Sequence, residues 1–169
     1  MKKLNVLMLF VLTSLLLFSS CGINGGFIVS EEKKADARME QIVVAIKNKD
    51  RGAVKSLFSK KALGEADNFE GGIDYLFDFI QGDIISWKRD GWSSGESIEY
   101  GKKSLMIRFS IIVNTDKEDY VLFVMDYNVD TINPDNEGVY TLEITRLADR
   151  DNIQRSWQER LCAGIHKLE

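Results

Sequence analysis

Apolar residues recur at helical spacing in the first half of this chain and alternate with polar residues in the second half. The helical spacing predicts a first helix over residues 30–49, a second that begins after Asp50, and a third over 69–80. Ser30 and Asp50 are suitable N-caps, because their side chains accept hydrogen bonds from backbone N–H groups in the first turn. Gly82 is a natural C-cap for the third helix. The folded part of the chain is therefore predicted to begin with a layer of helices.

Alternation with a period of two replaces the helical spacing after Gly82, and it predicts strands. It is cleanest over residues 105–113, whereas residues 120–129 are apolar on both faces. The second pattern is typical of a central strand covered on both sides, or of one that lines a cavity. Shorter strand candidates lie at 84–89, 98–100 and 140–144. A last strand would carry on one face Trp157, Leu161, Ala163 and Ile165. A helix over 153–161 is the alternative for this last segment.

Helices followed by strands, with links too short for parallel crossovers, predict an α+β fold with N-terminal helices packed on an antiparallel sheet. Three helices on a curved sheet of four to six strands resemble the NTF2-like or cystatin-like cone. In that cone the helices and the concave face of the sheet enclose a pocket. Residues 30–169 show no internal repeat and no low-complexity segment, so we expect them to form one domain.

The N-terminal segment has the three-part pattern of a secretory signal peptide. Lys2 and Lys3 supply positive charge, residues 4–18 form an almost unbroken apolar run, and Ser19-Ser20-Cys21 closes it. An uncleaved membrane helix is the alternative, but the run falls short of the ~20 apolar residues that a span needs. Residues 1–20 are therefore predicted to be a signal peptide.

The exit of this segment, Phe18-Ser19-Ser20-Cys21, resembles the lipobox of bacterial lipoproteins. The resemblance implies that Cys21 becomes the new N-terminus and carries a lipid. Residues 21–29 would then be the lipidated cysteine and a flexible tether. The expected location is the extracytoplasmic face of the bacterial cell membrane, with the lipid on Cys21 as the anchor.

The formal net charge of the full chain is −4. The chain after the signal peptide is more acidic still, because it lacks the positive charges of Lys2 and Lys3. An acidic domain is repelled by phosphate backbones, which argues against nucleic acid as a partner. If Cys21 is lipidated, Cys162 has no cysteine partner, and we expect it to be a small buried apolar residue. A reactive thiol is the alternative, with the nearby His166 as its base.

Three stretches together suggest a family: WKRDGW at 87–92, FVMDYNVDTINPDNEGVY at 123–140 and AGI at 163–165. They resemble an uncharacterised group of bacterial lipoproteins, the domain of unknown function 5104, and the likeness covers roughly residues 35–167. The resemblance implies an NTF2-like fold and a surface lipoprotein. It implies no reaction and no catalytic residues.

One acidic stretch has the spacing of a calcium loop. Asp126, Asn128, Asp130 and Glu137 match four ligand positions of an EF-hand. Thr131, however, stands where that loop requires glycine, and the flanking segments are predicted strands. The alternative is a strand end followed by an Asx- and Pro-rich turn. We therefore expect no cofactor, with these four residues as the only metal-ligand candidates.

Asp126 is also the candidate catalytic residue, because it interrupts an apolar strand. Burial would raise the pKa of its carboxyl group and make it a general base, the role that an Asp plays in ketosteroid isomerase on a similar cone. Tyr75, Tyr100 and Tyr140 are candidate donors for a developing oxyanion. The alternative is that Asp126 lies where the strand emerges, solvated or bonded to the backbone.

Trp87 and Trp92 flank a short polar run. They could form a platform for a sugar ring or a peptide, or they could cover one end of the core and hold a loop in place. The complete set of pocket candidates is Tyr75, Trp87, Trp92, Tyr100, Asp126 and Tyr140.

The sequence shows no zinc, phosphate-loop or dinucleotide motif. We therefore expect a lipid-anchored module that binds a small molecule, an envelope glycan or a protein, and not an enzyme. Two alternatives stay open. One is a small lyase, isomerase or hydrolase with Asp126 as base, and the other is an interaction domain that forms a homodimer.

Overall fold

Four helices and two short 3-10 segments accompany five strands in the computed structural model, which describes residues 30–152 and 162–168. The helices come first: α2 Glu31–Lys47, α3 Arg51–Leu57, α4 Lys60–Glu65 and α5 Phe69–Phe79. The strands follow: β1 Ile84–Glu99, β2 Lys102–Thr115, β3 Asp119–Asp130, β4 Gly138–Arg146 and β5 Gly164–Lys167. The 3-10 segments are η1 Pro134–Asn136 and η2 Leu147–Asn152. The predicted α+β class is confirmed.

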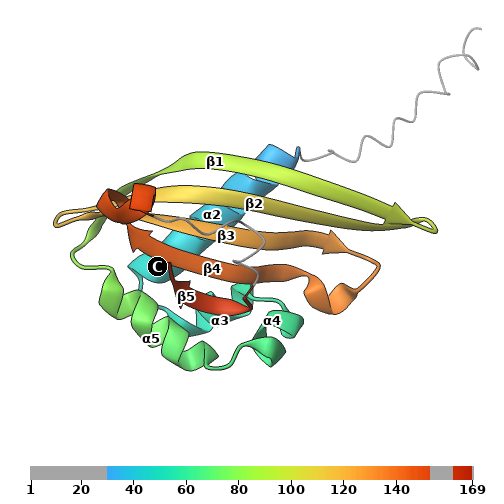
Figure 1. Ribbon diagram of the computed structural model, residues 1–169, viewed down its shortest axis with the longest axis horizontal. Helices are drawn as coiled ribbons and strands as arrows, with labels where there is room; N and C mark the ends of the chain where they lie inside the picture. Colours follow the sequence, from blue (N-terminus) through green and yellow to red (C-terminus); the bar gives the residue numbers. More distant parts are fainter. Residues whose placement is uncertain (1–29, 153–161, 169) are drawn as a thin grey trace, which may run out of the picture.

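The five strands form one open sheet in the order β1-β2-β3-β4-β5 (Figure 1). The first four strands pair antiparallel, as predicted, and β3 is the central strand. β5 pairs parallel to β4, so the prediction of an antiparallel last strand is wrong. Residues 147–163 are a long enough link to return the chain to the other end of the sheet, which a hairpin turn cannot do. Trp157, Leu161 and the alternative helix over 153–161 lie outside the described residues.

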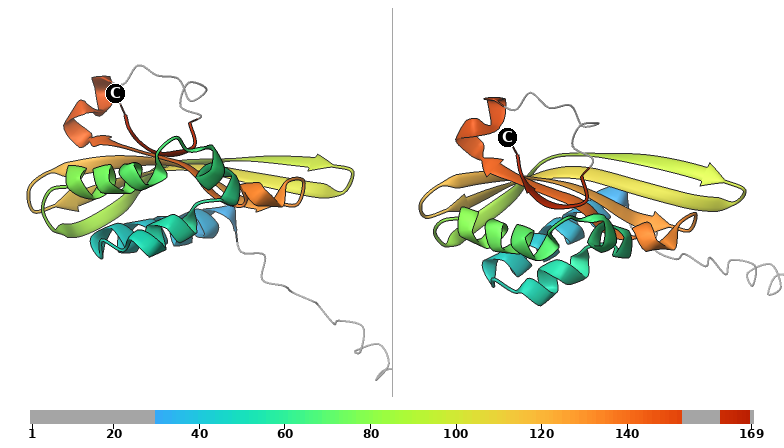
Figure 2. Two further views of the ribbon diagram at one scale, coloured as in Figure 1. Left: turned by 90° about the horizontal axis from the view of Figure 1, so that it is seen from below. Right: turned by 60° about the horizontal axis from the view of Figure 1, so that its bottom comes forward.

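The helices pack against one face of the sheet, and η2 lies on the other face (Figure 2). The alternation along β2 supplies five core-facing side chains, each at most 2 % exposed: Leu105, Ile107, Phe109, Ile111 and Val113. Met39, Ile42 and Ile46 of α2 belong to the same core. Removing this apolar surface from water is the main force that holds α2 on the sheet, at about 25 cal/mol per Å².

The predicted helix starts are confirmed by their caps. Ser30 Oγ accepts a hydrogen bond from the Lys33 N–H at 3.3 Å, and Asp50 Oδ1 accepts one from the Ala53 N–H at 2.9 Å. At the end of α5 the C-cap is Ile80, and Gly82 lies just beyond it with a φ of +85°. Local hydrogen bonding therefore sets where the helices begin.

Two elements differ from the pattern-based predictions. The short helix α4 was not predicted, because its six residues are too few for an apolar stripe. Its N-cap is Ser59, whose hydroxyl accepts a hydrogen bond from the Ala62 N–H. Strand β1 is continuous, whereas the sequence predicted separate strands at 84–89 and 98–100. The polar residues between them pair with β2 along a ladder whose register shifts between Ile84 and Ser86 and again between Arg89 and Gly91. Pairing with a neighbouring strand has outweighed weak local alternation.

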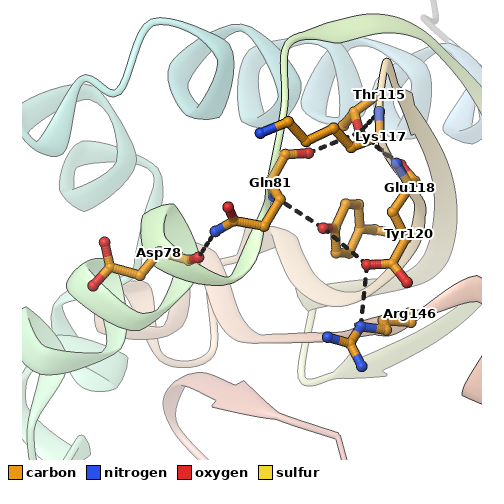
Figure 3. Close-up of polar contacts among 7 residues, drawn as sticks. All are labelled: Asp78, Gln81, Thr115, Lys117, Glu118, Tyr120 and Arg146. Carbon is orange, nitrogen blue, oxygen red and sulfur yellow. Dashed lines mark hydrogen bonds and ion pairs between the residues drawn. The ribbon is translucent and has the colours of Figure 1, made fainter.

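A network of hydrogen bonds ties the link after α5 to the turn between β2 and β3 (Figure 3). The buried Tyr120 hydroxyl accepts a hydrogen bond from the Gln81 N–H at 2.9 Å and donates one to Glu118 at 3.3 Å. Glu118 also pairs with Arg146 of β4 at 3.1 Å. The Thr115 hydroxyl bonds the Gln81 carbonyl at 2.8 Å. The network holds the turn between β2 and β3 against the helical layer.

Candidate functional site

The candidate site lies where α2 crosses β3, at a carboxylate that faces the helical layer. The Asp126 side chain is 1 % exposed, and its Oδ1 lies 3.0 Å from Arg38 Nε. The Arg38 N–H does not point at that oxygen, and among the described residues neither carboxylate oxygen accepts a well-aligned hydrogen bond. A buried carboxylate in this condition is costly, so it calls for an explanation.

The sequence places both partners by simple periodicity. Asp126 follows Leu122 and Val124 on the core face of β3, two residues apart at each step. A bulge between Met125 and Asp126 interrupts the pairing with β4 at this point. Arg38 lies beside the buried stripe of α2, four residues before the core residue Ile42. A helix flank and a strand face therefore bring a cation and an anion together.

The electrostatic state of Asp126 follows from this position. Burial raises the pKa of the Asp126 carboxyl above its ordinary value, whereas the charge of Arg38 and polar contacts with Arg38 and Asn128 lower it. The net direction is upward, because desolvation is the largest effect. The interpretation that Asp126 is solvated at a strand end is therefore wrong.

A surface pocket of about 200 Å³ adjoins this ion pair. Its lining residues are Lys33, Lys34, Ala37, Arg38, Gln41 and Asn128. Gln41 Oε1 accepts a hydrogen bond from Arg38 Nη1 at 3.2 Å. Asp126 itself does not line the pocket and lies next to two residues that do, Arg38 and Asn128. Arg38, 21 % exposed, thus connects the buried carboxylate to solvent.

The other pocket candidates do not gather around Asp126. Tyr100 is fully exposed at the turn between β1 and β2. Trp92 is 40 % exposed and lines a separate hollow on β1 and β2. Trp87 packs against the core, and Tyr75 stacks on Phe79 with ring centroids 5.2 Å apart.

Tyr140 lies at a third place, against the short helix α4. Its hydroxyl donates a hydrogen bond to Glu65 at 2.8 Å. Burial and this hydrogen bond raise the pKa of Tyr140 to about 12. None of the three candidate tyrosines lines the pocket beside Asp126.

The four metal-ligand candidates are divided between two sites. Asp130, 2 % exposed, accepts hydrogen bonds from the N–H groups of Ile132 and Asn133 and from the Asn136 amide. Glu137 accepts one from the Asp130 N–H at 2.9 Å. The hydrogen bonds that the Asp130 carboxylate accepts outweigh the effect of burial and lower the pKa of Asp130. The segment is a strand end followed by an Asx-rich turn, and the described residues contain no group of three or more metal-ligating side chains.

The expectation of a buried Cys162 is wrong, because its side chain is exposed. It precedes the short strand β5 at the surface. His166 is engaged locally, with Nε2 2.8 Å from the Ala163 carbonyl. Cys21 lies outside the described residues.

Arg38, Lys33, Lys34 and Gln41 were not singled out from the sequence. The available signal was a cation at the border of the predicted apolar stripe, since Arg38 follows the buried Ala35 by three residues. That signal is weak, because most such cations are solvated. Only the strand that the helix covers shows which carboxylate Arg38 meets.

A known protein family matches most of the described part of the chain. A family described as a domain of unknown function (DUF5104) matches residues 41–149. This range includes Asp126 and Asn128 and begins just after Arg38. No curated protein matches the chain. None of the helices in the described part of the chain is long and apolar enough to cross a membrane.

Proposed function

We propose that the chain, which belongs to the DUF5104 family whose description names no activity, is a lipid-anchored binding module. Its ligand site is the pocket over Arg38 and Asp126. The observation that carries this proposal is the buried Asp126 carboxylate, which lacks a well-aligned donor and lies next to a solvent-reachable pocket.

The burial of Asp126 has an energetic cost that a functional role would explain. Burial removes water from the charged Asp126 carboxylate, which costs free energy. The positive charge of Arg38 offsets that cost only in part. An apolar residue of similar size would pack among Leu122 and Val124 without this cost. A carboxylate beside a cleft whose pKa is raised by burial is a candidate for a functional site. Binding at Arg38 supplies a reason for the pair to be present.

The NTF2-like fold is part of the same proposal. Helices on one face of a meandering sheet favour the NTF2-like cone that the sequence resembles. In this protein the space between helices and sheet is filled by apolar side chains, among them Met39, Ile73 and Leu122. The ligand is therefore expected at the open flank of α2 instead of deep in the cone.

The location follows from the lipobox-like sequence before Cys21. A lipid on Cys21 would hold the domain on the extracytoplasmic face of the cell membrane. The ligand would then be a small molecule, an envelope glycan or a protein met outside the cytoplasm. Nucleic acid is not expected, because the domain is acidic.

The experiment is a thermal-shift screen of the full-length lipidated chain in neutral detergent, with metabolite pools and envelope glycan fragments. Arg38→Lys keeps a positive charge for Asp126 but removes the planar guanidinium, so it should lower the affinity of a stabilising ligand about tenfold. Arg51→Lys is the matched control, since Arg51 also lies on a helix and pairs with carboxylates, Glu70 and Asp74. A ligand that binds both variants as it binds the wild type would refute this site.

Catalysis with Asp126 as base is the second candidate function. The burial of Asp126 and its raised pKa favour it. Arg38 and Asn128, in place of the tyrosines, would be the donors to a developing oxyanion. Asp126→Asn should then abolish turnover and leave binding at Arg38 in place. A substrate that the Asn variant still converts would exclude this role.

A homodimer is the third candidate, and the outer edge of β1 favours it. β1 is sixteen residues long, forms one edge of the sheet, and exposes Ile98 by 66 %. Such edges pair readily with a second strand. Light scattering of the full-length chain in detergent should then give twice the protomer mass. A strict monomer at all concentrations would remove this candidate.

A further inference from the structure

The pocket over Arg38 is positively charged, although the domain as a whole is acidic. Three of its six lining residues are the cations Lys33, Lys34 and Arg38. Within the described ranges, neither lysine ammonium group has an ion-pair partner. By contrast, Arg51 and Arg89 elsewhere on the surface each pair with two carboxylates. The potential at this pocket therefore favours a negative ligand.

The bonding of Arg38 leaves one end of its guanidinium available. Nε lies 3.0 Å from Asp126 Oδ1, and Nη1 donates a hydrogen bond to Gln41. No residue of the described chain accepts a hydrogen bond from Nη2. Asp126 holds the side chain in place from below, and the arginine fork is suited to two oxygens of one anion. The amide of Asn128 adds a neutral donor on the strand side.

The size of the pocket limits the ligand. A volume of about 200 Å³ is smaller than the ~300–1,000 Å³ typical of sites for drug-sized molecules. It suits one small charged group, either free or at the end of a larger molecule. Its lining also has no aromatic ring on which a sugar could stack.

We propose that this pocket binds an oxyanion, a phosphate or carboxylate group, through Arg38, Lys33 and Lys34. The inference rests on the proposed function and specifies its ligand. The two lysines supply long-range attraction, and Arg38 supplies the directed contacts. Asp126 is a positioning residue for Arg38 and does not touch the anion.

The anion can come from two sources with the same chemistry. One is a free anion in the medium, and the other is the headgroup of an anionic lipid. Residues 21–30 reach at most about 36 Å when fully extended, so a lipid on Cys21 keeps the first turns of α2 within that distance of the headgroups. The experiment must separate these sources.

The test titrates inorganic phosphate, acetate and, as a neutral probe, glucose into the full-length chain in neutral detergent, with chemical shifts as the readout. Phosphate or acetate should bind saturably, and less tightly as sodium chloride is raised. Lys33→Gln with Lys34→Gln leaves the core and Asp126 intact and should weaken anion binding about tenfold. Lys102→Gln with Lys117→Gln removes the same charge elsewhere on the surface and should leave it unchanged.

A second arm identifies the source in nanodiscs of phosphatidylcholine or phosphatidylglycerol. If headgroups occupy the pocket, phosphate binds the wild type more weakly in phosphatidylglycerol, and the lysine double variant shows no such difference. Equal phosphate binding by the wild type in both lipids indicates a free anion. Both results support an oxyanion site.

The inference and the proposed function fail in different ways. If a ligand from the screen binds the lysine double variant normally but is lost in Arg38→Lys, the site is correct and the oxyanion assignment is wrong. If neither phosphate nor acetate binds the wild type saturably, the oxyanion assignment is also wrong. If the ligand binds Arg38→Lys and the lysine double variant as tightly as it binds the wild type, both proposals are refuted.

Discussion

The pKa of the Asp126 carboxyl is shifted upward, whereas the pKa values of most native carboxyls are shifted downward. Burial raises its pKa above the ordinary 3.8, and Arg38 only partly opposes the shift. The folded state therefore holds the proton more tightly than the unfolded state. Its contribution to stability is complete below the unfolded pKa and is lost as pH rises through the folded pKa. In its charged form Asp126 is a net cost to the fold.

This predicts the pH dependence of Asp126→Asn. The free energy of unfolding of the wild type, minus that of the variant, should fall as pH rises from about 4 through the raised pKa. Urea unfolding at a series of pH values measures the difference. Asp90→Asn is the matched control, because hydrogen bonds from Arg150 and Ser110 outweigh burial and lower the pKa of Asp90. For Asp90→Asn, the free energy of unfolding of the wild type minus that of the variant should rise with pH. Equal slopes for the two variants would contradict the raised pKa of Asp126.

At the scale of elements, the turn between β3 and β4 depends on one side chain. Asp130 is buried and holds two backbone N–H groups and the Asn136 amide. Asp130→Ala leaves these donors without an acceptor and should lower the free energy of unfolding by about 2 kcal/mol. Asp135→Ala in the same turn removes only an exposed contact with Lys60 and should change it little. Urea titration of both variants measures the two free energies of unfolding. Equal losses of stability would show that the turn does not depend on Asp130.

The start of β4 carries a second requirement, for glycine at 138. Gly138 has a φ of +120°, and a Cβ there would lie 2.9 Å from the Leu57 carbonyl and from the Ser59 nitrogen. Gly138→Ala should therefore cost about 3 kcal/mol through backbone strain and a clash with backbone atoms. Gly64→Ala in α4 meets open space and should stabilise the protein by about 0.5–1 kcal/mol. Thermal unfolding of both variants tests the contrast. A stable Gly138→Ala protein would show that β4 shifts easily.

At the scale of the whole molecule, the attachment at Cys21 decides which ligands the domain meets. Cys21→Ser removes the thiol that would carry the lipid and should move the protein from the membrane fraction to the soluble fraction. Cell fractionation and the mass of the intact chain measure this. Cys162→Ser is the control and should leave the protein in the membrane fraction. A Cys21→Ser chain that stays in the membrane with residues 1–20 still attached would establish the uncleaved helix instead.

The sequence by itself determined the features that depend on near neighbours. The caps at Ser30 and Asp50 and the alternation over 105–113 are local, because they involve hydrogen bonds or side-chain directions within a few residues. The strand character of 120–129 and its central place followed from apolarity on both faces. Asp126 was singled out as an unusual carboxylate because it interrupts that apolar strand, although the sequence left open whether it is buried or solvated.

Only the tertiary structure decided what depends on residues far apart in the chain. The continuity of β1 comes from its pairing with β2, and the parallel direction of β5 is seen only in its pairing with β4. The pair of Arg38 and Asp126 exists because α2 lies across β3, and no spacing in the sequence records that crossing. Periodicity places a side chain on a face of its own element. Packing selects the side chain that it meets.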